Sequence, residues 1–275
     1  MTTTRTPLHL TALVAVTLVA TGCASTTQSG AVGVERKQLL LVSSQEAEQG
    51  AAVFYAKEKE KFARAGALNV NPQQTARVKH IVAGLIEQAG AFRPDTRNWQ
   101  WEVNVISSPE VNAYCAAGGK MAIYTGLLDG LKLTDNEVAA VMGHEIAHAL
   151  REHTREAMSQ ALAEQVGISV LAAAFNLNQN SANLLGSATQ VGLNLPFSRG
   201  KEREADRIGV ELMARAGFDP RDAVTLWRKM LAGGGRTPEF LSTHPDPENR
   251  IKDIEAHLPS VLPLYEEAKR RKSGR

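Results

Sequence analysis

An apolar run, "VMGHEIAHAL", constrains this chain most strongly, because it contains two histidines and a glutamate. His144, Glu145 and His148 lie there among Val, Met, Ile, Ala and Leu residues, where burying an unpartnered polar side chain is unfavourable. Upstream, Thr134 and Glu137 form a capping-box pair, and the apolar pattern that follows is helical. The three polar side chains therefore belong to one helix, and each of them needs a partner.

On a helix, His144 and His148 are four residues apart, so both imidazoles leave one face and can converge on one ion. Glu145 is displaced by about 100° from His144, which places its carboxylate beside such an ion. A general base for an attacking water molecule must stand there, and HExxH is typical of zinc proteases. The alternative is a chance match, with the histidines directed to solvent or hydrogen-bonded in the core.

A catalytic zinc site needs a third protein ligand. In "SRGKEREADRIGVELMARAG", Glu202 and Asp206 share one helix face, so Glu202 can complete a His, His, Glu set. Asp206 can then hydrogen-bond the far nitrogen of a ligand imidazole. Glu204 points about 200° away from Glu202, and we expect His153 to be solvated farther along the first helix. The alternative is that the three acidic residues form only a charged outer face.

Three motifs follow one another in the chain, "HEIAH", "SRGKEREAD" and "STHPDPENRI", and "NAYCAAGGKMAIYTGLL" precedes them. Their order resembles that of the M48 metallopeptidases, and most of all their exported bacterial lipoprotein members. The resemblance covers approximately residues 36–258. It implies an α+β, zincin-like metalloprotease domain, mostly helical, with a small β-sheet beside the HExxH helix. It also implies one zinc ion per chain, with His144, His148 and Glu202 as its ligands. Glu145 is then the catalytic base, and Asp206 orients a ligand histidine.

His244 has more than one interpretation. In similar periplasmic proteins the equivalent histidine can bind the zinc as a fourth ligand and keep the enzyme shut. The alternative is a role in the transition state or in the structure, with Arg250 fixing the proline-containing loop. We therefore consider His244, Arg250 and Tyr124 as candidate catalytic donors to the oxyanion that develops on the substrate.

Other patterns predict the surrounding fold as one α+β domain. A capping box at Ser43 predicts a helix to about Ala65, and a second helix begins near Pro72. "WQWEVNVIS" and "GGKMAIYTGLL" are predicted strands, and a substrate strand could pair with the edge of "KMAIYT". Residues 166–197, between the two ligand-bearing helices, are expected to form a helical hairpin or a mobile flap.

The N-terminus has the pattern of a lipoprotein signal peptide over residues 1–22. Its apolar run "LTALVAVTLVA" is too short to span a bilayer, and it ends in "ATGCAS", which looks like a lipobox with Cys23 as the lipidated residue. An ordinary secretory signal is the alternative. We expect a flexible tether over residues 23–35 and the peptidase domain, with its basic C-terminal tail, over residues 36–275. Cys115 is then left without a partner, as a small buried residue.

Charge and composition narrow the function. The 31 basic and 29 acidic residues nearly balance, so nothing indicates a nucleic-acid partner. We predict a zinc endopeptidase, lipid-anchored in the bacterial envelope, that hydrolyses misfolded or unassembled envelope proteins. Ala24 follows Cys23, which favours delivery to the outer membrane, facing the periplasm. The outer-membrane assembly machinery is a further candidate partner. The alternative is a zinc-containing assembly factor or holdase that binds such proteins with little or no proteolysis.

Overall fold

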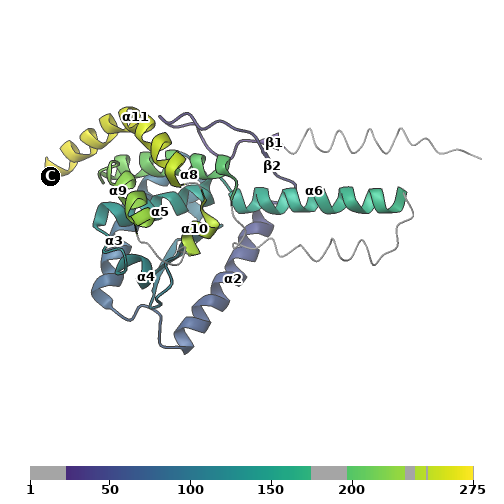
Figure 1. The fold of residues 1–275 in the computed structure, drawn as a ribbon, viewed down its shortest axis with the longest axis horizontal. Coiled ribbons are helices and arrows are strands. Elements are labelled where there is room, and N and C mark those ends of the chain that lie inside the picture. Colours follow the sequence, from purple (N-terminus) through teal and green to yellow (C-terminus); the bar gives the residue numbers. More distant parts are fainter. Residues whose placement is uncertain (1–22, 175–196, 233–238, 246, 275) are drawn as a thin grey trace, which may run out of the picture.

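Helices surround a small sheet in the computed structural model, which describes residues 23–174, 197–232, 239–245 and 247–274 (Figure 1). This mostly helical α+β architecture confirms the predicted fold class. The predicted signal peptide and most of the expected hairpin between the ligand-bearing helices lie outside these residues. The helices are α2 (Ser44–Arg64), α3 (Pro72–Ala89), the short 3₁₀ helix η1 (Pro94–Asn98), α4 (Thr125–Leu128), α5 (Asp135–Leu150), α6 (His153–Ala174), α8 (Arg199–Ala216), α9 (Asp222–Ala232), α10 (Glu239–Thr243) and α11 (Pro247–Ser273).

Helix α5 is the central element of the domain. The Thr134 side chain accepts a hydrogen bond from the Glu137 backbone N–H, and the Glu137 carboxylate accepts one from the Thr134 N–H, so the predicted capping box is present. Every residue from Glu137 to Leu150 is buried, because α3, α8, α9 and strand β4 (Ala113–Ala116) pack around the helix. A helix that is apolar on all sides is stable only in such a position.

Two glycines let α5 and α8 approach closely. A Cβ on Gly209 would lie 2.9 Å from the backbone nitrogen of His144, and a Cβ on Gly143 would lie 3.1 Å from the Gly209 carbonyl oxygen. No other residue type fits at this crossing without a shift of backbone. The crossing therefore brings the HExxH helix against the helix that carries Glu202 and Asp206.

The sheet has three strands in the order β3 (Glu102–Ile106), β5 (Lys120–Tyr124) and β4. Strand β5 pairs in parallel with β3 and antiparallel with β4, with Met121 opposite both Val103 and Cys115. The prediction that "KMAIYT" has a free edge is therefore wrong, because both of its edges are occupied. The two edge strands are β3 and β4, and the four residues of β4 are too few to show a period-two pattern. Cys115 in β4 is a buried free cysteine, as predicted.

The segment expected to be a flexible tether packs on the domain. Strand β1 (Cys23–Ala24) pairs antiparallel with β2 (Gln38–Leu39), and the chain between them lies across the surface beside α8. Val32 and Val34 are buried, and the Val32 N–H donates to Glu211 Oε2 over 3.1 Å. The expectation fails because these two valines reach the core, which the small and polar composition around them conceals.

Helix α6 begins where α5 ends and projects away from the rest of the domain (Figure 1). Near its start, Ser159 Oγ accepts hydrogen bonds from the backbone N–H groups of Leu41 and Val42, which ties this end to the N-terminal segment. No helix within the described residues is both long and apolar enough to cross a bilayer.

Candidate metal centre

Four buried side chains from three parts of the chain converge beside α5. His144 and His148 come from α5, Glu202 from the first turn of α8, and His244 from the residue after α10. Each offers one nitrogen or oxygen atom, and these atoms all lie within 4.8 Å of one another. Imidazole nitrogen and carboxylate oxygen are the donors that zinc binds at catalytic sites, so the donor set fits this ion.

The individual distances describe a tight cluster. His144 Nε2 and His148 Nε2 are 3.0 Å apart, and Glu202 lies 3.5 Å from the first and 3.3 Å from the second. His244 Nδ1 lies 3.2 Å from His144 Nε2 and 3.1 Å from Glu202 Oε1. The structure thus brings together the three residues predicted from spacing and the fourth one suggested by resemblance.

Asp206 determines how His144 presents its ring. Its Oδ1 atom lies 3.0 Å from His144 Nδ1, and because a carboxylate only accepts, this nitrogen must carry the proton. Arg250 Nη2 lies 3.1 Å from the same nitrogen, but Asp206 Oδ1 accepts its hydrogen at 2.7 Å. The Nε2 lone pair of His144 is therefore directed into the cluster, where a cation can bind it.

Arg250 lies behind the cluster and supports the acidic residues. Its guanidinium contacts Asp206 Oδ2 at 2.6 Å and Glu202 Oε2 at 2.7 Å, and lies 3.6 Å from the Trp227 ring centroid. The side chain is 1% exposed and does not line the cavity beside the cluster. Its hydrogen-bonding groups are directed to carboxylates and not into the cavity, so the structure does not support the prediction of Arg250 as a donor to the oxyanion.

Glu145 has a carboxylate oxygen that is free to accept a proton. Among buried side-chain nitrogens and oxygens of the described residues, its Oε1 alone lacks a hydrogen-bond partner. His244 Nε2 lies 3.4 Å from this oxygen but forms no hydrogen bond with it. Burial raises the pKa of the Glu145 carboxyl, which makes it a better proton acceptor than an ordinary surface glutamate. A buried oxygen without a hydrogen bond is energetically unfavourable, unless a polar group of a bound water or substrate donates to it.

A cavity of about 300 Å³ opens beside this oxygen. Its walls come from α2, the edge strand β4, the end of β5, α5 and the residue after α10. Glu145, His148 and His244 line it on the cluster side, and Tyr124 also lines it. Of the three candidate oxyanion donors, His244 and Tyr124 therefore face the space where a substrate can lie.

Two residues near the cluster differ from their predicted positions. His153 is 0% exposed rather than solvated, because Glu152 adopts a positive φ of 49° and the chain turns before α6 begins. Glu204 is 8% exposed and lies 3.1 Å from His153 Nε2 instead of on an outer face. Sequence periodicity misses both, because the N-terminal segment and α6 cover the side of α8 that it treats as solvent-facing.

Comparisons with known proteins agree with this geometry. A family model described as peptidase family M48 matches residues 72–258. The chain is 38% identical over 177 residues to the mitochondrial metalloendopeptidase OMA1 of Arabidopsis thaliana, which covers 63% of this chain and 35% of that one. It is 40% identical over 165 residues to the OMA1 of Schizosaccharomyces pombe, covering 59% and 48%, respectively.

A third relative is bacterial. The beta-barrel assembly-enhancing protease of Escherichia coli is 34% identical over 173 residues, covering 58% of this chain and 35% of the relative. The chain thus spans between about a third and a half of the length of the relatives it matches.

Proposed function

The chain belongs to peptidase family M48, and on that premise we propose that it is a zinc-dependent endopeptidase of the bacterial envelope. The observation that carries the proposal is the four-residue donor cluster with the unpartnered oxygen of Glu145 beside it, at the wall of a cavity. His144, His148 and Glu202 would hold the ion. Zinc bound by these ligands would supply a Lewis acid, which polarises a carbonyl and makes a coordinated water more acidic.

Glu145 would perform the proton transfers. Its free oxygen accepts a proton from the attacking water, and the raised pKa of this carboxyl suits it to hand the proton to the leaving nitrogen of the peptide bond. Tyr124, at the wall of the cavity, is the side chain we assign to the developing oxyanion.

His244 would act as a fourth ligand in the resting enzyme. Its Nδ1 atom points toward Glu202 and His144, and its ring is stacked on Phe240 with centroids 4.4 Å apart. Its backbone N–H donates to the Phe240 carbonyl over 2.9 Å. With zinc bound, a ring held in this way would be a ligand in place of the catalytic water, so cleavage would require His244 to leave.

The substrate would be extended polypeptide. The edge strand β4 lines the cavity that contains Glu145, so a substrate strand could add to this edge rather than to "KMAIYT". Such pairing selects unfolded chain over folded protein. The name of the bacterial relative, a beta-barrel assembly-enhancing protease, supports misfolded or unassembled envelope proteins as substrates and the outer-membrane assembly machinery as a partner.

Cys23 would determine where in the cell envelope the protein is located. The signal-like residues 1–22 and the lipobox-like "ATGCAS" support acylation of this cysteine, and Ala24 favours delivery to the outer membrane, facing the periplasm.

Purified protein tests the proposal. We expect about one zinc per chain by elemental analysis, and hydrolysis of unfolded casein that a chelator stops and added zinc restores. Stoichiometric zinc without any hydrolysis, even after His244 is replaced, would instead indicate the holdase alternative. Absence of tightly bound zinc would show that the donor cluster has another purpose.

A further inference from the structure

The far side of the His148 ring contacts a second histidine. His148 Nδ1 and His153 Nδ1 are 2.9 Å apart, and the two ring centroids lie 4.9 Å apart at an angle of 73°. Both side chains are buried, with His153 0% exposed. One of the two facing nitrogens must therefore carry a proton and the other must accept it.

Glu204 determines which of the two nitrogens is the donor. Its Oε2 atom lies 3.1 Å from His153 Nε2, and a carboxylate only accepts, so His153 carries its proton on Nε2. In the neutral ring the other nitrogen, Nδ1, then has the lone pair and accepts the hydrogen bond. His148 then donates from Nδ1, and its Nε2 lone pair is directed at the cluster.

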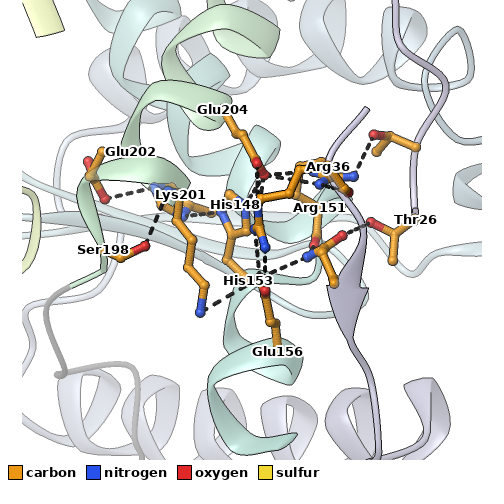
Figure 2. Close-up of polar contacts among 12 residues, drawn as sticks. Thr26, Arg36, His148, Arg151, His153, Glu156, Ser198, Lys201, Glu202 and Glu204 are labelled. Carbon is orange, nitrogen blue, oxygen red and sulfur yellow. Dashed lines mark hydrogen bonds and ion pairs between the residues drawn. The ribbon is translucent and has the colours of Figure 1, made fainter. Parts of the chain in front are cut away.

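Two arginines hold the Glu204 carboxylate in place. Arg36 donates from Nε and Nη2 to both oxygens of Glu204, and Arg151 donates from Nε to Oε2 over 3.1 Å. These contacts hold the Glu204 carboxylate against His153 Nε2. Figure 2 shows the arrangement, with His148 between Glu202 on one side and the group around Glu204 on the other.

We propose that His153 and Glu204 are positioning residues that fix the tautomer and the orientation of His148 for metal binding. They do for His148 what Asp206 does for His144, through one more ring. Partners of this kind raise the basicity of a ligand imidazole, and their loss typically weakens metal binding about 10- to 100-fold. The inference rests on the proposed zinc site and extends it to two residues outside the ligand set.

Three variants of His153 separate positioning from packing. The side-chain oxygen of asparagine lies about where Nδ1 of histidine lies, so His153→Asn can still accept from His148. The side-chain oxygen of glutamine lies about where Nε2 lies, so His153→Gln loses this acceptor, as does His153→Leu. We expect zinc affinity, measured by competition with a fluorescent chelator, to fall about 10- to 100-fold in the Gln and Leu variants, with most of it retained in the Asn variant.

A matched control and a spectroscopic measurement complete the test. Tyr55→Phe removes a buried hydroxyl that contacts Asn104 and the Met121 carbonyl, so it should lower stability and leave zinc affinity unchanged. Long-range ¹H–¹⁵N spectra of the zinc-free protein should show His148 protonated at Nδ1 in the wild type, and a mixture of tautomers in His153→Leu.

The opposing results are distinct. Equal zinc affinity in the wild type and all three variants would overturn the positioning role and leave the zinc site intact. Equal losses in the Asn and Gln variants, in proportion to their loss of stability, would show that His153 only fills space. Wild-type protein that binds no zinc would overturn the proposed function, and this inference with it.

Discussion

Gly143 and Gly209 meet where α5 crosses α8, with room for no side chain between the two backbones. A Cβ on Gly209 would lie 2.9 Å from the His144 nitrogen, so the separation of the two helices depends on this glycine. The same crossing sets how far His144 lies from Glu202. The packing of the two helices and the geometry of the donor cluster are therefore coupled.

Gly209→Ala should weaken both the packing of α5 against α8 and the binding of zinc by the donor cluster. Backbone must shift to accept the methyl group, and overpacking of this kind costs about 1–3 kcal/mol of unfolding free energy, against a helix-propensity gain of about 1 kcal/mol. We also expect weaker zinc binding, because the donor atoms separate. Gly200→Ala, in the same helix, is the control: its Cβ would meet nothing nearer than Ser198 Oγ at 3.8 Å, so it should keep or raise stability. Urea unfolding of both variants is the measurement, and equal stability would contradict the role of the crossing.

Glu145→Gln should bind zinc and fold normally but fail to cleave casein. The amide cannot accept the proton of the water, and loss of a general base typically costs about 10²- to 10⁴-fold in rate. Proteolysis at the wild-type rate would exclude the mechanism. Assembly activity retained in cells that carry only this variant would favour the holdase alternative.

Glu202→Ala should lose most bound zinc, because the variant lacks the third ligand and leaves Arg250 without one of its two acidic partners. Glu211→Ala is the matched control. Glu211 is also buried on α8, but it pairs with Arg215 and the Val32 N–H, so its loss should lower stability without releasing metal. Zinc content per folded chain decides, and equal retention in the two variants would remove Glu202 from the ligand set.

His244→Ala should raise the rate on unfolded casein while zinc stays bound. If the imidazole occupies the fourth position, its removal admits the water that Glu145 activates. A donor to the oxyanion would behave in the opposite way, and its loss would slow turnover about 10²- to 10³-fold. The sign of the change at saturating zinc distinguishes the two, and a slower variant would rule out His244 as an inhibitory ligand.

Cys23→Ser should prevent membrane association. An acylated Cys23 partitions the protein into membranes, whereas the variant keeps its signal peptide or is released. Fractionation of cells that express each form, with outer and inner membranes separated on a density gradient, is the measurement. Wild-type protein found wholly in the soluble periplasmic fraction would contradict acylation.

Local patterns in the sequence predicted those parts of the site that lie on one helix. The capping boxes at Ser43 and Thr134 and the four-residue spacing of His144 and His148 are properties of short segments, and the structure contains them. Sequence reasoning failed where distant segments meet. Whether Glu204 faces solvent depends on the N-terminal segment lying over α8, and no periodicity within α8 records that.

Strand β4 was missed for a related reason. Its four residues, "AYCA", form a strand because they pair with β5, not because their own pattern requires it. Arg250 illustrates the converse error. A basic residue near a predicted active site suggests a role toward the substrate, whereas the guanidinium of Arg250 forms ion pairs with the two carboxylates buried beside it.

The packing of residues 24–37 onto the domain limits its reach. A lipid on Cys23 would leave almost no slack between bilayer and enzyme, because the strand that begins at this residue already pairs with β2. The domain could neither swing out into the periplasm nor turn freely at the membrane surface. Its substrates would then be confined to polypeptides that come close to the lipid headgroups, so the anchor itself would restrict which polypeptides reach the cavity.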